Sequence, residues 1–230
     1  MKNITIAIDG FSSTGKSTLA KQLAKHLGYI YVDTGAMYRA VTLFAMENGY
    51  ISNEYFDKET LINSLANIKL HFEFNSDLGF AEMFLNDKNI EKEIRTLEVS
   101  NYVSKIAEVS QVRAKLVEQQ QEMGKNKAIV MDGRDIGTVV FPDAELKIYM
   151  TASAETRAQR RYDELIAKGD SVTFEEVLEN VQKRDYIDTH RDDSPLRMAD
   201  DAIEIDNSYL DRDEQFKAVL ELVEETTKSE

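Results

Sequence analysis

The sequence predicts an α/β fold built on a parallel sheet, and three observations support that prediction. Five short apolar runs rich in β-branched residues alternate with longer stretches of helical periodicity, the pattern of βαβ units. Four of these runs are followed directly by an aspartate, at the strand ends where open α/β sheets bind ligands. A glycine-bearing loop separates the first run from the first helical stretch. We therefore expect helices on the faces of the sheet and chemistry at the carboxyl ends of its strands.

The predicted strands are short and apolar. They cover residues 4–8, 29–32, 128–131, 146–150 and 202–205. The aspartates that follow four of them are Asp9, Asp33, Asp132 and Asp206. For any single one of these, the ordinary alternative is an aspartate that begins a turn or caps a helix.

The segment 61–95 interrupts the alternation of strands and helices. Residues 70–74 and 80–85 each alternate apolar with polar side chains around a turn signal at 75–77, which predicts a small antiparallel hairpin. This insertion is either a substrate-covering subdomain or a decorated sheet edge. Predicted helices cover 91–123, 154–168 with Gly169 as C-cap, 173–185 with a Thr173/Glu176 capping box, and 210–225.

Composition excludes several classes of protein. The 230 residues carry a net charge of −14, with a pI near 4.8, which argues against non-specific nucleic-acid binding. No apolar run approaches the ~18 residues that span a bilayer, and the N-terminal segment lacks the pattern of a secretory signal. The chain has no cysteine, so it has neither disulfides nor thiolate chemistry. We expect a cytoplasmic protein without membrane or nucleic-acid partners.

Residues 10–17, G-F-S-S-T-G-K-S, fit the phosphate-binding loop G-x-x-x-x-G-K-[ST]. The required context is present, because a predicted strand precedes the loop and a helical pattern follows it. In such a loop Lys16 reaches the β- and γ-phosphates and the Ser17 hydroxyl ligates Mg²⁺. The predicted ATP-binding residues are Gly10, Phe11, Ser12, Ser13, Thr14, Gly15, Lys16, Ser17 and Thr18.

The remaining sequence favours phosphoryl transfer to a small acceptor over other uses of such a loop. A GTPase would carry N-K-x-D, and the nearest match at 126–129 lacks the aspartate. Arginine is absent before Arg39, and six arginines crowd between Arg157 and Arg197. Arginine binds phosphate bidentately, as an enzyme that holds two polyanions requires. By composition alone, surface salt bridging is the ordinary explanation for the arginines.

Four further motifs complete the pattern. D-T-G-A-M-Y-R at 33–39 follows the second predicted strand, and D-G-R-D-I-G-T at 132–138 follows the third. Helical spacing places Arg157, Arg160 and Arg161 on one face. It likewise aligns Arg184, Asp188 and Arg191.

These motifs closely resemble those of the bacterial cytidylate kinase family. The matched stretches, from residue 8 to about 191, also include E-I-R-T-x-E-V and R-x-x-R-R. The resemblance implies a three-layer α/β/α P-loop fold with a five-stranded parallel sheet, as a single domain over 1–230. Its core would cover about 1–60, 96–153 and 195–230, its antiparallel NMP-binding subdomain about 61–95, and its helical lid about 154–194.

The resemblance also implies a reaction, the transfer of the ATP γ-phosphoryl group to CMP or dCMP with Mg²⁺. Arg39 and Arg134 would bind the acceptor phosphate, Arg184 and Asp188 its ribose, and Arg191 the reacting phosphates. Thr34 and Tyr38 complete the predicted CMP site, in which Ser104, Arg113 and Asp135 would read the base. The catalytic set would be Lys16, Arg134, Arg157, Arg160, Arg161 and Arg191, with the three arginines of 157–161 on the lid.

The chemistry of base reading has independent support, because a carboxylate is the natural partner of the cytosine N4 amine. The ordinary alternatives are an ion pair for Asp135 and solvent exposure for Arg113 and for the 157–161 arginines. Asp33 and Asp132 are the candidates to hold Mg²⁺ through water or to orient Lys16. No general base is required, since the acceptor phosphate is already anionic.

Two other functions stay open on sequence grounds. One is a related kinase acting on UMP, AMP, shikimate or dephospho-coenzyme A, and the other is a nucleotide-binding regulatory module without turnover. The predicted base-reading set disfavours the first, and the intact Lys16, Arg39 and Arg134 disfavour the second. We expect a monomer whose partners are ATP and CMP or dCMP.

Overall fold

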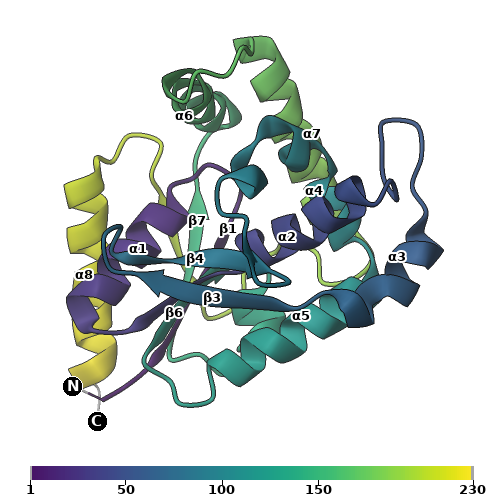
Figure 1. The fold of residues 1–230 in the computed structure, drawn as a ribbon. Helices are drawn as coiled ribbons and strands as arrows, with labels where there is room; N and C mark the ends of the chain where they lie inside the picture. Colours follow the sequence, from purple (N-terminus) through teal and green to yellow (C-terminus); the bar gives the residue numbers. More distant parts are fainter. Residues whose placement is uncertain (1, 229–230) are drawn as a thin grey trace. The chain divides into compact units, whose positions relative to one another are not determined.

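The computed structural model describes residues 2–228 and divides into two compact units (Figure 1). The larger unit comprises the residues up to Val32 together with those from Gln121 onward, and the smaller unit comprises Asp33–Gln120. Within the described part of the chain, no helix is long and apolar enough to cross a membrane.

A five-stranded sheet forms the centre of the larger unit. Its strands are β1 (Thr5–Gly10), β2 (Ile30–Asp33), β6 (Ile129–Gly133), β7 (Leu146–Thr151) and β8 (Ile203–Asp206). Their order is β2-β6-β1-β7-β8, β1 runs parallel to β6 and β7, and β7 runs parallel to β8. All five predicted strands are confirmed, although the sequence pattern missed the last one or two residues of each. Those residues include the polar side chains at the carboxyl edge.

The core of the larger unit lies between this sheet and two helices, α1 (Lys16–Leu27) and α8 (Arg212–Lys228). Every residue of β1 is buried, and α1 and α8 lie side by side (Figure 1). Leu19 and Leu23 of α1 join Val219 and Val223 of α8 in one apolar cluster with the strand residues. This apolar packing anchors the start of α1, and therefore the loop that precedes it.

Two further helices, α6 (Ala154–Ala167) and α7 (Phe174–His190), are bounded by the predicted signals. Gly169 has a φ of +88°, and the N–H of Asp170 donates to the Leu165 carbonyl at 3.0 Å, which is a Schellman ending. Thr173 and Glu176 form the predicted capping box at the start of α7. Helix α7 continues five residues beyond the predicted end.

The smaller unit carries the predicted hairpin. Strands β3 (Leu70–Asn75) and β4 (Phe80–Leu85) pair antiparallel, and a two-residue strand β5 (Lys88–Asn89) extends the sheet. The Asn75 side chain accepts the N–H groups of Asp77 and Leu78, which closes the turn. The remaining elements are α2 (Thr34–Glu47), α3 (Lys58–Ser64), α4 (Leu97–Ala107), α5 (Ser110–Met123) and short 3-10 turns at Leu65–Asn67 and Glu93–Arg95.

The prediction of one continuous helix over 91–123 is wrong. Thr96 caps α4 by accepting the Val99 N–H, so the preceding Glu93–Arg95 forms a separate turn. A second break follows Ala107, where the Arg113 guanidinium donates to the Ala107 carbonyl at 3.3 Å. The apolar periodicity runs through both breaks, and this explains why the pattern suggested a single helix.

Candidate active site

The loop between β1 and α1 has the conformation that the phosphate-binding motif predicts. Gly10 has a φ of +142°, and a Cβ there would lie 2.0 Å from the Met150 carbonyl oxygen, so only glycine fits. The Lys16 ammonium folds back to donate to the Phe11 carbonyl at 2.5 Å and to the Thr14 hydroxyl at 3.3 Å. Among the described residues, no side chain caps α1, whose N-terminus therefore offers N–H groups to an anion.

Lys16 is buried, with 4% of its surface exposed. Burial, reinforced by the positive charge of Arg134, lowers the pKa of Lys16 to about 7, although Asp132 and Asp9 act in the opposite sense. The protein alone thus leaves this ammonium poorly compensated. A bound polyphosphate would supply the missing negative charge.

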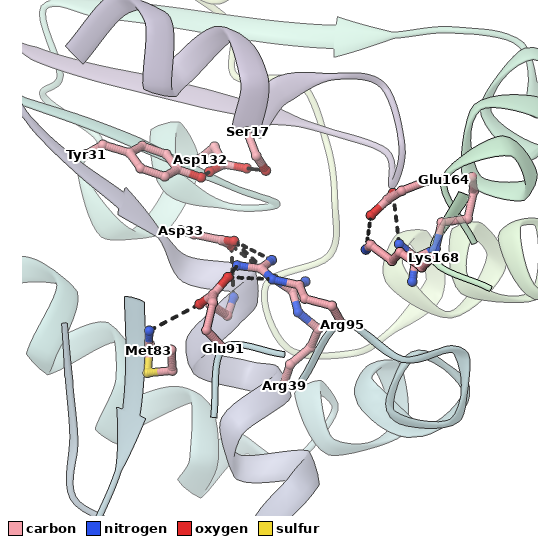
Figure 2. A network of polar contacts seen from close by, with 12 residues as sticks. Ser17, Tyr31, Asp33, Arg39, Met83, Glu91, Arg95, Asp132, Glu164 and Lys168 are labelled. Carbon is pink, nitrogen blue, oxygen red and sulfur yellow. Dashed lines mark hydrogen bonds and ion pairs between the residues drawn. The ribbon is translucent and has the colours of Figure 1, made fainter. Parts of the chain in front are cut away.

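Asp132 and Ser17 place two oxygen donors side by side in the larger unit. The Ser17 hydroxyl donates to one carboxylate oxygen of Asp132 at 2.9 Å, and the Tyr31 hydroxyl donates to the other at 2.8 Å (Figure 2). Within residues 2–228 no group of three or more His, Cys, Asp or Glu side chains gathers to form a metal cage. Mg²⁺ retains several waters and takes few protein ligands, so these two donors fit it.

Asp9, to which the sequence assigned no role, connects β1 to the segment that carries Arg134 and Asp135. Its carboxylate accepts the N–H groups of Ile136 at 2.8 Å and Gly137 at 2.7 Å, at the start of a π-helical turn over Ile136–Val140. Burial raises the pKa of Asp9 to about 7, against the two backbone hydrogen bonds that lower it. The sequence signal for this contact was the aspartate that follows the predicted apolar run 4–8.

Arg134 and Asp188, both predicted site residues, form an ion pair of 2.9 Å. Asp188 is buried, a location that disfavours its charge, but Arg134, Arg184 and Arg191 together lower its pKa. Arg191 also donates twice to the Ser194 carbonyl, at 2.9 and 2.6 Å. Arg184 and Asp188 of α7, and Arg191 directly after it, therefore lie in one electrostatic cluster with Arg134.

The three arginines of α6 have three different environments. Arg157 is 3% exposed, pairs bidentately with Asp185 at 3.0 and 2.6 Å, and lies 5.0 Å from the centre of the Phe11 ring. Arg161 pairs with Glu164. Glu164 also binds Lys168 (Figure 2). Arg160 donates to Asn207. A purely solvated helix face does not describe Arg157, which packs against the phosphate loop.

In the smaller unit Asp33 is the centre of a separate polar network (Figure 2). Its carboxylate binds Arg39 at 3.0 Å and Arg95 at 2.8 Å. The same carboxylate caps α2 by accepting the Ala36 N–H. Glu91 binds Arg95 at 2.6 Å. Burial by itself would raise the pKa of the Asp33 carboxyl group. The positive charges of Arg39 and Arg95 have the larger effect and lower this pKa. Arg95 lies in a matched motif, yet the sequence assigned it no role.

The other predicted residues of the smaller unit are buried. They are Thr34, Tyr38, Ser104 and Arg113. The Arg113 guanidinium lies 5.5 Å from the centre of the Tyr38 ring, in cation–π range. Arg113 is therefore not the exposed helix residue of the ordinary alternative. Asp135, in the larger unit, is also buried, at 4% exposure.

With this geometry established, comparison with known proteins gives a clear result. The family model described as "Cytidylate kinase" matches residues 6–225. The chain belongs to the cytidylate kinase family. A protein named "Cytidylate kinase" from Flavobacterium johnsoniae is 75% identical over 228 residues, covering 99% of each chain. Another of that name from Parabacteroides distasonis is 58% identical over 221 residues, covering 96% of each.

Family membership confirms the resemblance and the prediction of an enzyme, and it implies ATP-dependent phosphoryl transfer. A solved structure of an uncharacterized protein from Eubacterium ventriosum shares the fold, with a TM-score of 0.51 and 13% identity. That match covers 97% of this chain and 99% of the other. The five-stranded sheet and the small antiparallel sheet agree with the predicted α/β fold.

Proposed function

We propose that this chain transfers the γ-phosphoryl group of ATP to CMP or dCMP, producing ADP and CDP or dCDP. The observation that carries the proposal is the family match over residues 6–225, which includes an intact phosphate loop with a buried Lys16. The proposal also includes a monomeric state and a location in the cytoplasm. These two points stay predictions from the sequence.

Lys16 and the N-terminus of α1 are proposed to bind the β- and γ-phosphates. The ammonium already occupies the loop, so it would exchange its contacts with Phe11 and Thr14 for phosphate oxygens. Ser17 and, through water, Asp132 would hold Mg²⁺, which neutralises phosphate charge when bound. Asp33, the other candidate for this ion, is engaged with Arg39 and Arg95.

Arg39, Arg134 and Arg191 are proposed to bind the acceptor phosphate and the migrating phosphoryl group. Arg39 and Arg134 each hold a carboxylate partner, Asp33 and Asp188 respectively, at 3.0 and 2.9 Å. Such partners orient a guanidinium, whose five N–H groups in a planar fork suit it to binding phosphate bidentately. Because the acceptor phosphate is already an anion, positioning and electrostatic stabilisation suffice without a general base.

Asp135, Ser104 and Arg113 are proposed to read the cytosine base. A carboxylate accepts from the N4 amine, and Arg113 would donate to the ring acceptors. Uracil presents an oxygen in place of the amine, which leaves a buried carboxylate facing an acceptor. Arg184 and Asp188 would bind the ribose. The arginines of α6 would assist transfer and exclude water, which otherwise competes as an acceptor.

An ADP-release assay tests the acceptor. The protein is mixed with ATP and Mg²⁺ and offered CMP, dCMP, UMP, AMP or shikimate in turn. We expect turnover with CMP or dCMP to exceed that with the others by at least about a hundredfold, in the range that buried polar recognition provides. Absence of turnover with both cytidine nucleotides would refute the proposal.

The variant Asp135→Ala tests base reading in the same assay. We expect kcat/KM for CMP to fall about a hundredfold and that for UMP to fall much less, because only cytosine uses the carboxylate. Asp143→Ala, which removes an exposed aspartate from the following loop, serves as the matched control. Equal losses with CMP and UMP would remove Asp135 from base reading.

A further inference from the structure

Asn207 has no role in the predicted site, yet each of its main-chain and side-chain polar groups makes a hydrogen bond beside the phosphate loop. It follows β8 directly and is 2% exposed. Its backbone N–H donates to the Thr151 carbonyl at 3.0 Å, where β7 ends. The residue is thus fixed at the carboxyl edge of the sheet, where the ligands of α/β proteins bind.

The side-chain amide of Asn207 hydrogen-bonds to the backbone of the phosphate loop. Its Nδ2 donates to the Thr14 carbonyl and, at 2.8 Å, to Oε1 of Gln215, a buried residue in the first turn of α8. A Cβ added at Gly15 would lie 3.4 Å from the same nitrogen. Both amide hydrogens are therefore used, and they fix the backbone of the loop next to Gly15, the residue that caps α1.

The oxygens of Asn207 face the other way, toward α6. Arg160 donates from Nη1 to the Asn207 side-chain oxygen at 3.2 Å and from Nη2 to its main-chain oxygen at 2.8 Å. Arg157 and Arg161 are each neutralised by a carboxylate. Arg160 has no carboxylate partner within the described residues. Two uncharged oxygens thus orient its guanidinium without cancelling its positive charge.

We propose that Asn207 is a positioning residue for the ATP side of the reaction. It fixes the Thr14 carbonyl of the phosphate loop and presents Arg160, with its charge intact, next to that loop. An asparagine is suited to this role because it both donates and accepts without introducing charge. The inference rests on the proposed function, since it assigns Arg160 to the phosphates of a nucleotide.

The first test is the kinetic profile of Asn207→Ala, with ATP and CMP varied separately. We expect KM for ATP to rise about tenfold and kcat to fall about tenfold, while KM for CMP changes less than about twofold. Ser208→Ala alters the neighbouring side chain of the same connection and should leave all three constants unchanged. Equal increases in both KM values would overturn the proposal.

Asn207→Asp tests the two roles of the side chain, as a donor to the phosphate loop and as an uncharged acceptor for Arg160. The aspartate has the same size, but it removes both N–H donors and places a carboxylate against Arg160 and the Thr14 carbonyl. We expect ATP binding to weaken at least as much as in Asn207→Ala, because the carboxylate neutralises Arg160 and repels phosphate. Retention of wild-type ATP binding by Asn207→Asp would show that neither the donors nor the free charge matters.

Arg160→Ala and the double variant show whether Asn207 acts through Arg160. We expect the loss of kcat in the double variant to be smaller than the product of the two single losses, the mark of coupled residues. Multiplicative losses would refute the link. Calorimetric titration with ATP alone, without an acceptor, separates this inference from the proposed function. About tenfold weaker binding to Asn207→Ala is expected even if CMP is not the acceptor, and unchanged binding would refute the inference.

Discussion

The phosphate loop of the larger unit and the Asp33 network of the smaller unit both bury charge, but they stabilise it differently. Lys16 contacts a carbonyl and a hydroxyl, and burial lowers its pKa to about 7. Asp33 holds two arginines, which lower its pKa despite burial. The protein compensates the Lys16 charge of the loop only in part, through Asp132 and Asp9, whereas the charges of the network are paired within it.

This difference predicts different consequences of binding an anion. At Lys16 a phosphate adds a favourable interaction and restores the charged form of the lysine. At Arg39 a phosphate has to share the guanidinium with Asp33, so the net gain is smaller and orientation matters more. The loop is therefore suited to supplying binding energy, and the network is suited to holding arginines in fixed directions.

Lys16→Ala gives the largest expected effect, because it removes the partly compensated charge itself. We expect kcat to fall about a thousandfold or more, as for loss of a principal electrostatic contact to transferring phosphate. The ADP-release assay measures this. Lys25→Ala, an exposed position near the end of the same helix, is the matched control and should retain full activity. Retention of most activity by Lys16→Ala would contradict the assignment of the loop.

Asp33→Asn changes the other region and should act on stability. The amide preserves the cap of α2 but leaves Arg39 and Arg95 without their shared carboxylate. We expect the free energy of unfolding to fall by about 2–3 kcal/mol, somewhat below the values for fully buried pairs because both arginines are partly exposed. Urea unfolding at neutral pH measures the change.

Asp57→Asn is the matched control for this stability change. Asp57 caps α3 by accepting the Thr60 N–H, as Asp33 caps α2, but it has no arginine partner within the described residues. An amide should preserve that cap almost fully. If the two variants lost the same stability, the arginines would not explain the effect at Asp33.

The sequence was sufficient for the parts of the molecule that depend on local pattern. The strands and helices, the hairpin, the capping box at Thr173 and the phosphate loop all follow from residue order, because each of these elements is specified by residues close together in the sequence. The contacts of Asp9 and Asn207 were not predictable in this way. Their partners lie 127 or more residues away for Asp9, and 193 residues away for the Thr14 contact of Asn207.

The predicted arginines show the same limit. Helical spacing correctly placed Arg157, Arg160 and Arg161 on one helix but indicated nothing about their separate partners, which come from α7, the β8–α8 connection and α6 itself. The break between α4 and α5 was missed because Arg113 satisfies the Ala107 carbonyl from a distance of six residues. Apolar periodicity does not record such polar contacts.

Asp9→Asn should change the free energy of unfolding least of these variants. The pH dependence of that change tests the charge balance beside the phosphate loop. The folded pKa of about 7 exceeds the usual value of 3.8, so the stabilising contribution of Asp9 is fully present below pH 3.8. It is lost as pH rises through 7. We expect the stability of the wild type, relative to Asp9→Asn, to fall by about 1–2 kcal/mol between pH 5 and pH 7.5, measured by urea unfolding.

Asp206→Asn is the control for that pH dependence, because Asp206 also lies at the carboxyl end of a strand but is exposed. Its hydrogen bonds from Ser208 lower its pKa, so it is ionised throughout this range and its removal should cause no pH-dependent difference. Lys16 works in the opposite sense to Asp9, since its lowered pKa adds stability only as pH rises from 7 toward 10.5. A relative stability that stayed constant from pH 5 to 7.5 would mean that Asp9 is ionised as easily as Asp206. The contrast between a partly compensated loop and a compensated network would then be confined to Lys16.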